Sequence, residues 1–282
     1  MKKILILYGA LTLFIASSLH SENIFPSGIL AAQEAYEVES LLASYRDQIA
    51  GVKRRGNEII FRIGNTEIYY CNGKMLSEAH IAEATQYDSI FYQYRKGPLT
   101  VSTRSLPYPV HRSSDLLDAL FGSTEQTVRV QSRWVDFLGH RVFMHRICAE
   151  PLMRINRRIM ERSSRVKELE EFLRDIKIMY SMKRRNVRGT NNMSYHSYGL
   201  AIDIIPESYN EKHVYWRWSS VFQENWEYIP AEQRWQPPQE LIDAFEDNGF
   251  VWGGKWYYFD NVHFEYRPEI LWLSERLYPT GD

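Results

Sequence analysis

Residues 194–205 have the sequence SYHSYGLAIDII, which is the most informative stretch of the chain about its fold. Their apolar end predicts a strand that begins near Leu200. His196 and Asp203 are seven positions apart, and in one continuous strand an odd separation would point them to opposite faces. A turn at Tyr198-Gly199 is therefore needed before both side chains reach one metal ion, and the glycine gives that turn its conformational freedom.

A second segment, DNVH at residues 260–263, adds a further histidine. The chain then offers two imidazoles and one carboxylate. Three protein ligands leave one position open for water, as in catalytic zinc sites, whereas structural zinc sites are usually closed by four ligands. The sequence therefore predicts a Zn2+ site at His196, Asp203 and His263. Asp260, three residues before His263, is the candidate general base.

Together the two segments resemble the VanY-like zinc D-Ala-D-Ala carboxypeptidases, which share a fold with lysostaphin-type peptidases and hedgehog signalling domains. The family signature S-x-H-x-x-G-x-A-x-D is met from Ser194 to Asp203. Average residue usage gives this match about one chance occurrence in ten thousand chains of this length. The second signature, an acid three residues before the last histidine, is met at Asp260 and His263. The resemblance covers roughly residues 128–279.

The resemblance implies the same three zinc ligands and the same base. It also implies an arginine upstream of the first signature that stabilises the oxyanion of the tetrahedral intermediate. The family spacing, an arginine four residues before a glycine, favours Arg185 over Arg188. The alternative is that Arg184, Arg185 and Arg188 together form a solvated basic turn.

The function implied by the resemblance is hydrolysis of peptidoglycan stem peptides, most simply by a D-alanyl-D-alanine carboxypeptidase. Several relatives have Glu as the base, whereas Asp, as at Asp260, occurs in endolysin-type peptidases that cut between L-Ala and D-Glu. An endopeptidase of that type is therefore an alternative. A catalytically inactive, metal-containing module that binds the wall is another. We favour the enzyme because a binding module needs no base.

Aromatic residues are frequent between the two signatures. They either wall a substrate groove or form a satellite core, and we favour the core. The residues concerned are Tyr215, Trp216, Trp218, Trp226 and Trp235.

For the fold we predict the α+β class. An antiparallel sheet carries the metal ligands, helices flank it, and the resemblance implies a zinc D-Ala-D-Ala peptidase or hedgehog-like arrangement with a smaller N-terminal region. Three local patterns add detail: a hairpin over residues 58–71 around Gly64-Asn65, a helix over residues 166–180, and an aromatic hairpin over residues 250–259 broken at Gly253-Gly254.

The first residues predict a secretory signal peptide at residues 1–21. Lys2 and Lys3 precede an apolar run, Ile4–Ala16, which small residues follow. The run is shorter than the roughly 20 residues that span a bilayer, so a permanent anchor is the weaker alternative. We expect export to the periplasm or cell envelope and no stable membrane insertion of the mature chain. Residues 22–127 are then an N-terminal region of unknown role, and residues 128–282 the zinc metallopeptidase domain.

The net charge bears on which binding partners to expect, and the two cysteines bear on whether the chain contains a disulfide. The 34 Lys and Arg nearly balance the 35 Asp and Glu, so the formal charge of -1 gives no general attraction to nucleic acid. Peptidoglycan stem peptides are the expected partner, and the oligomeric state stays open. Cys71 and Cys148 form either one disulfide, as an oxidising compartment permits, or two buried thiols.

Overall fold

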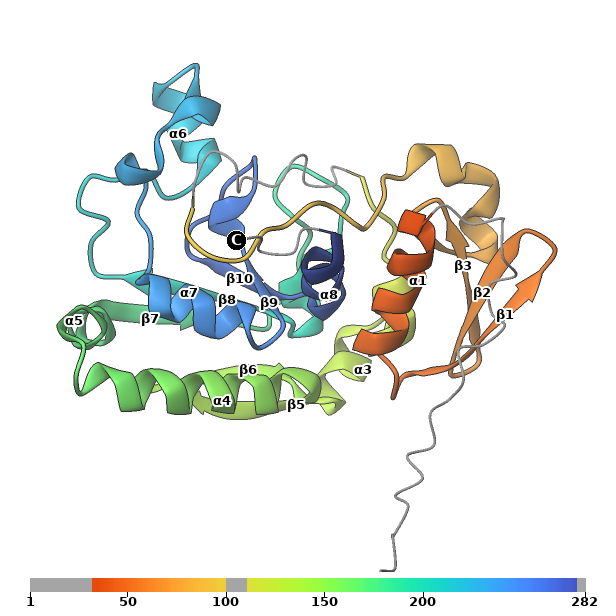
Figure 1. Cartoon of the computed structure of the whole chain (residues 1–282), viewed down its shortest axis with the longest axis horizontal. Helices are drawn as coiled ribbons and strands as arrows, with labels where there is room; N and C mark the ends of the chain where they lie inside the picture. The colour runs from red at the N-terminus through yellow and green to blue at the C-terminus, as the bar shows by residue number, and fades with distance from the viewer. Residues whose placement is uncertain (1–31, 100–110, 278–282) are drawn as a thin grey trace, which may run out of the picture.

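The computed structural model of the chain describes residues 32–99 and 111–277 (Figure 1). The N-terminal part has one helix before a four-stranded antiparallel sheet of order β1-β2-β3-β4 and two short helices after it. Its elements are α1 (Ala32–Ser44), β1 (Ile49–Arg55), β2 (Glu58–Ile63), β3 (Thr66–Cys71), β4 (Lys74–Ser77), the 3-10 segment η1 (Glu78–Gln86), α2 (Asp115–Phe121) and α3 (Glu125–Val130).

The remainder contains a two-stranded hairpin, β5-β6, and a four-stranded antiparallel sheet of order β7-β8-β10-β9. Helices flank this second sheet, so the predicted α+β class is confirmed. The elements are β5 (Ser132–Phe137), β6 (His140–His145), α4 (Arg146–Ser163), α5 (Lys167–Asp175), β7 (Ile176–Tyr180), η3 (Tyr195–Tyr198), β8 (Ala201–Pro206), α6 (Trp216–Phe222), η4 (Trp226–Tyr228), η5 (Ala231–Gln233), α7 (Gln239–Glu246), β9 (Phe250–Trp252), η6 (Gly253–Lys255), β10 (His263–Tyr266) and α8 (Pro268–Leu277).

Helix α4 shows how the sequence pattern produces the packing. Its buried residues Cys148, Leu152, Ile155 and Ile159 recur at intervals of three and four, which aligns them on one face of a helix. That face packs against α7 and the β5-β6 hairpin, and α7 in turn packs against β9 (Figure 1). The helices thereby support the sheet that carries the candidate site.

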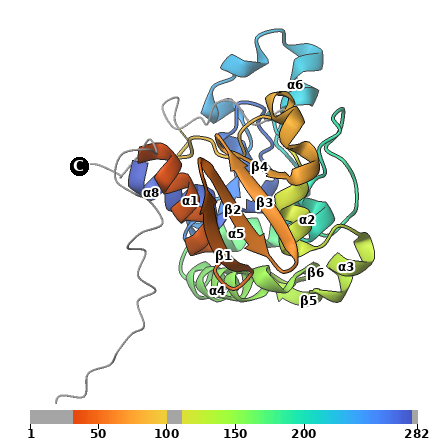
Figure 2. The same cartoon turned by 90° about the vertical axis from the view of Figure 1, so that its right-hand side faces the viewer.

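One buried core runs through both parts of the chain. Helix α1 packs against α8, as Figures 1 and 2 show. The segment after η1 inserts Tyr94, whose hydroxyl donates to the Glu246 carboxylate at 2.5 Å and accepts from the Trp252 amide at 2.9 Å. Glu246 also forms a buried ion pair with Lys255. The N-terminal part is therefore joined to the second sheet by buried polar contacts as well as by apolar packing.

The predicted hairpin at residues 58–71 is confirmed, with Ile63 opposite Thr66 across the Gly64-Asn65 turn. The single helix over residues 166–180 is wrong. Helix α5 ends at Asp175, and the next five residues form edge strand β7, because pairing with β8 outweighs their helical pattern.

The aromatic hairpin over residues 250–259 is also wrong. Strand β9 is only three residues long and pairs with β10, while Gly253 begins a 3-10 turn. The indole N–H of Trp252 donates to the Asn261 carbonyl at 2.8 Å, and a Cβ at Gly254 would lie 2.2 Å from that indole. The chain therefore folds back over the Trp252 ring instead of continuing as a strand.

Cys71 and Cys148 are free thiols, the first half-buried on β3 and the second buried on α4, so the disulfide alternative is not formed. The predicted signal peptide lies outside the described residues. Within residues 32–99 and 111–277, no helix combines the length and the apolar character needed to cross a bilayer.

Candidate active site

The register between β8 and β10 sets the geometry of the site. His263 is the direct partner of Asp203 across these antiparallel strands. Directly opposed residues share one face of the sheet, with Cβ atoms about 4.5–5.5 Å apart. The Asp203 Oδ1 atom accordingly lies 2.8 Å from His263 Nδ1.

His196 reaches the same carboxylate from the 3-10 turn η3, just before β8. Gly199 ends this turn with φ +65°, the left-handed conformation that glycine adopts without steric cost. The turn brings His196 Nε2 to 3.1 Å from Asp203 Oδ1. The sequence correctly predicted that a turn at Tyr198-Gly199 would allow both side chains to converge.

The three predicted zinc ligands, His196, Asp203 and His263, lie together, each offering one atom within 4.8 Å of the others. The hydrogen-bond partners of the two histidines leave one nitrogen of each ring facing Asp203. His196 Nδ1 donates to the Ser181 carbonyl at 2.7 Å, which leaves Nε2 directed at Asp203. His263 Nε2 faces the Glu265 carboxylate at 3.2 Å, which leaves Nδ1 for Asp203. A metal ion in this position would face His196 Nε2, His263 Nδ1 and Asp203 Oδ1, and two imidazole nitrogens with one carboxylate oxygen are a donor set that suits Zn2+.

Electrostatics of the cluster agree with this geometry. Burial opposes the charge on Asp203, but the two imidazoles outweigh it and hold the pKa of that carboxyl well below its usual range. Burial also opposes the charge on His263, yet its hydrogen bonds to Asp203 and Glu265 raise the His263 pKa to about 10. The cluster therefore attracts positive charge, which a divalent metal ion supplies.

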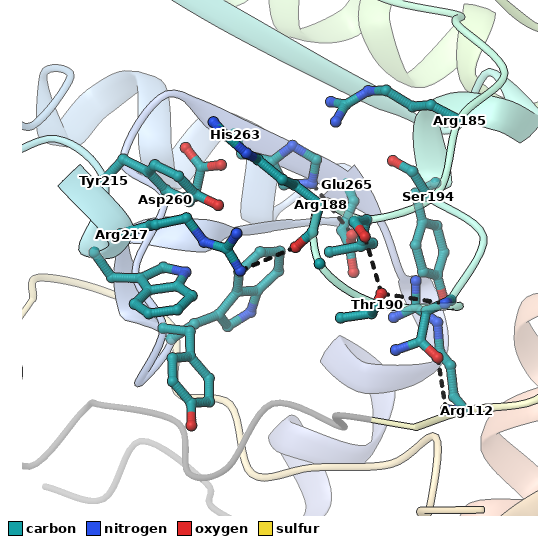
Figure 3. A pocket seen from close by; sticks show the side chains of 17 residues that line it. Arg112, Arg185, Arg188, Thr190, Ser194, Tyr215, Arg217, Asp260, His263 and Glu265 are labelled. Carbon is teal, nitrogen blue, oxygen red and sulfur yellow. Dashed lines mark hydrogen bonds and ion pairs between the residues drawn. The ribbon is translucent and has the colours of Figure 1, made fainter. Parts of the chain in front are cut away.

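Asp260 and His263 line a cavity of about 290 Å³ beside the cluster (Figure 3). Burial, together with the negative charge of Asp203, raises the Asp260 pKa to about 6, although His263, His196 and Arg185 act in the opposite direction. The Asp260 main chain is fixed by a bridge to Tyr215 and by accepting from the His263 amide at 3.2 Å. A carboxyl group in this position is suited to accept a proton near neutral pH.

Arg185 and Arg188, the two candidates for the oxyanion role, both line the cavity. The main chain of Arg185 is tied to the turn that carries His196: its N–H donates to Ser197 Oγ at 2.9 Å, and its carbonyl accepts from the Ser194 amide at 3.0 Å. The positive charge of Arg185 acts on Asp260. Both residues stay candidates for the oxyanion role.

Glu265 and Arg267 support His263 from behind. Arg267 Nη1 donates to the Glu265 carboxylate at 3.4 Å, and Nη2 donates to the Ile90 carbonyl at 2.7 Å. Arg267 also pairs with Glu269, which accepts from the Tyr45 hydroxyl at 2.6 Å. The orientation of a candidate metal ligand thus depends on residues from the N-terminal part.

The members of the predicted aromatic cluster lie in different environments. Tyr215 and Trp216 line the cavity, as a groove wall requires, whereas Trp235 is buried as core and Trp218 is exposed. Trp226 stacks on Tyr258, with ring centroids 5.6 Å apart. The preference for core was therefore wrong for Tyr215, Trp216 and Trp218 and correct for Trp235.

Several lining residues were not singled out from the sequence: Arg112, Asn192, Arg217, Trp256 and Tyr258. Arg112 precedes α2 and comes from a part of the chain in which no catalytic pattern was found. It reaches the cavity because its guanidinium stacks over the Tyr195 ring, 4.7 Å from the centroid, and donates to the Met193 carbonyl at 3.1 Å. No local sequence signal marks such a long-range contact.

Comparison with known families adds an independent finding. Residues 188–266 match the family model described as D-alanyl-D-alanine carboxypeptidase. The resemblance inferred from the signatures is confirmed. The D-alanyl-D-alanine carboxypeptidase match spans both ligand-bearing segments and implies a carboxypeptidase-like metallopeptidase. No curated protein and no solved structure matches the chain.

Proposed function

We propose that this chain is an exported zinc metallopeptidase that hydrolyses peptidoglycan stem peptides, most simply as a D-alanyl-D-alanine carboxypeptidase. The observation that carries the proposal is the convergence of His196, Asp203 and His263 within 4.8 Å beside a cavity that Asp260 and Arg185 line. The family match at residues 188–266 supports the same reaction class.

The proposed mechanism assigns one task to each residue. Zinc held by the three ligands would polarise the scissile carbonyl and lower the pKa of a water molecule. Asp260 accepts the proton of the attacking water and passes it to the leaving amine, a role that its raised pKa suits. Arg185 presents a fixed positive charge to the oxyanion. The electrostatic stabilisation that this charge provides is stronger in a site that excludes water.

Export is part of the proposal because the substrate lies outside the cytoplasm. It rests on the sequence of residues 1–21, in which two lysines precede a short apolar run and small residues.

The decisive experiment is mass spectrometry of purified peptidoglycan fragments after incubation with the zinc-loaded mature chain, with and without a chelator. Metal-dependent loss of one terminal alanine is the expected result. A metal-dependent cut inside the stem would keep the chemistry and identify an endopeptidase. If no metal-dependent product forms across varied wall types, the hydrolase proposal fails and a wall-binding module becomes the better explanation.

A further inference from the structure

Positive side chains exceed negative ones around the cavity. Four arginines line it, against the two carboxylates Asp260 and Glu265. Glu265 already interacts with His263 and Arg267. The arginines are Arg112, Arg185, Arg188 and Arg217. One arginine at the oxyanion and one carboxylate base do not account for this excess of positive charge.

Arg217 is held in place on the wall that α6 supplies. Its Nη2 donates to the Arg188 carbonyl at 3.1 Å, and its guanidinium lies 5.2 Å from the centre of the Trp216 ring. Gly189 permits this placement: its φ is +82°, and a Cβ there would lie 2.7 Å from Arg217 Nη2. A carbonyl oxygen, a glycine and an indole hold the guanidinium, and none of these three groups neutralises its charge.

Three of the four arginines, Arg185, Arg188 and Arg217, act on one residue of the cavity wall, Tyr215. In Figure 3 the Arg217 side chain comes from the side of Tyr215 and Asp260, while Arg185 and Ser194 lie on the opposite side. Burial chiefly raises the pKa of the Tyr215 hydroxyl and the charge of Asp260 raises it further, but Arg217, Arg188 and Arg185 each lower it. The charges of Asp260 and of these three arginines therefore act on the part of the cavity next to the Tyr215 hydroxyl.

We propose that Arg217, assisted by Arg188, binds a carboxylate of the substrate. A guanidinium is planar and donates two parallel hydrogen bonds to a carboxylate, and here one of its edges is already fixed by the Arg188 carbonyl. The proposal rests on the proposed function, because the carboxylate belongs to the same peptide that reaches the metal site. A stem peptide has two sources of this group: its C-terminus and an acidic residue within the stem.

The probes are three acetylated peptides: L-Ala-γ-D-Glu-L-Lys-D-Ala-D-Ala, its C-terminal amide, and the same peptide with D-isoglutamine in place of D-Glu. Each is tested with the wild-type chain, with Arg217→Met, which keeps the stem over Trp216, and with Arg217→Lys, which keeps the charge. Arg157→Met on the exposed face of α4 is the matched control. Binding is measured by calorimetry, and cleavage is measured separately with zinc.

We expect Arg217→Met to weaken binding of the unmodified peptide by roughly 10- to 100-fold, as loss of a charge-assisted hydrogen bond predicts. It should leave unchanged the binding of whichever amidated peptide lacks the carboxylate that Arg217 recognises. Arg217→Lys should recover part of the loss, and Arg157→Met should bind all three peptides as the wild type does. The insensitive peptide identifies the source of the carboxylate.

The results separate the subsite from the reaction. Equal losses for all three peptides in Arg217→Met, or no loss for any, would overturn the carboxylate subsite even if cleavage proceeds. A charge-dependent loss of binding without cleavage by any variant would support the subsite and refute the peptidase. If the wild-type chain neither binds nor cleaves any of the peptides, both proposals fail.

Discussion

At the scale of single residues, the site is organised around one carboxylate. Asp203 contacts both histidines through the same oxygen, Oδ1, which lies 3.1 Å from His196 Nε2 and 2.8 Å from His263 Nδ1. Asp260 is close enough for the charge of Asp203 to raise its pKa, yet it lies on the cavity wall. The two aspartates therefore have opposite electrostatic settings, one favouring the charged form and the other the protonated form, as a ligand and a base require.

Asp260→Asn tests the base directly. Removing a general base costs typically 10²- to 10⁴-fold in rate, so we expect kcat for stem-peptide hydrolysis to fall by at least about 100-fold. Zinc content, measured by mass spectrometry of the metal, should stay at the wild-type level. Asp247→Asn on an exposed surface is the control. Full activity of Asp260→Asn with zinc bound would contradict the assignment.

Glu265→Gln tests the support of His263. The amide oxygen still accepts from His263 Nε2, but the negative charge that favours this orientation is removed. We expect zinc affinity, measured by competition with a chromophoric chelator, to fall by roughly 10- to 100-fold. The exposed Glu275→Gln should leave the affinity unchanged. An unaltered zinc affinity in Glu265→Gln would show that Glu265 has only a structural role.

At the scale of elements, a turn and a strand pair place the ligands. Strand register aligns His263 with Asp203, and the turn that ends at Gly199 returns His196 to the same side. The Gly199 carbonyl also accepts from the His145 amide at 2.9 Å, so β6 lies against the turn. The site thus depends on a close backbone approach at Gly199.

Gly199→Ala tests that approach, with Gly64→Ala as the matched control. Both glycines have positive φ, +65° and +56°. Alanine in this left-handed conformation therefore costs about 1–2 kcal/mol of folding free energy at either position. Only Gly199 has a backbone neighbour in the way, because its Cβ would lie 2.7 Å from His145 N. We expect the free energy of unfolding, measured in urea, to fall by at least about 1 kcal/mol more for Gly199→Ala. Equal losses would contradict this account.

His80 and Asp115 give the fold a pH-dependent contact between η1 and α2, with Nδ1 and Oδ2 2.7 Å apart. The hydrogen bond to Asp115 raises the His80 pKa above 6.5, so this stabilisation is present below pH 6.5 and is lost as the pH rises through the raised pKa. Burial opposes the charge on Asp115, but hydrogen bonds from Ser77 and His80 lower its pKa below 3.8. The stabilisation that the charged Asp115 provides is present above pH 3.8 and is lost as the pH falls through the lowered pKa.

The difference in unfolding free energy between wild type and His80→Gln should therefore be greatest between about pH 4 and 6.5 and should shrink on both sides. Its size should stay below about 1 kcal/mol, because the His80 side chain is 40% exposed and the pair is screened by solvent. Urea titrations from pH 3 to 9 measure it. A difference that does not vary with pH would show that the pair contributes no electrostatic stability.

At the scale of the whole molecule, the N-terminal part completes the candidate site. It supplies Arg112 to the cavity and the Ile90 carbonyl that holds Arg267 behind Glu265. Tyr94 joins the buried pair of Glu246 and Lys255. A buried ion pair that loses a hydrogen-bond partner is costly, so this contact makes the two parts interdependent.

A chain of residues 128–282 tests that interdependence. It lacks α1, which packs against α8, and Tyr94, whose hydroxyl donates a hydrogen bond to Glu246. We expect it to show no cooperative thermal transition by circular dichroism, whereas residues 22–282 should unfold cooperatively. A cooperative transition in the shorter chain, with wild-type zinc affinity, would show that residues 128–282 form an independent domain.

The candidate ligands and the local geometry near them could be predicted from residue spacing alone. The spacing of His196, Asp203 and His263, with a glycine between the first two, was enough to predict convergence because a turn and a strand are short-range structures. The α+β class and the Gly64-Asn65 hairpin were predictable for the same reason. Residues 166–180 and 250–259 were not, because pairing with distant strands and packing around Trp252 outweigh local preference.

The residues that surround the cluster could be identified only from the folded chain. Arg112 comes from a segment far from the signatures in sequence, and Arg217 comes from α6, between them. The two meet at one cavity because α6 and the chain before α2 pack around it. Arg267, which supports His263 through Glu265, likewise donates a hydrogen bond to the carbonyl of Ile90 in the N-terminal part. These contacts join residues that are distant in the sequence to buried charged side chains. They therefore leave no periodic pattern in the sequence.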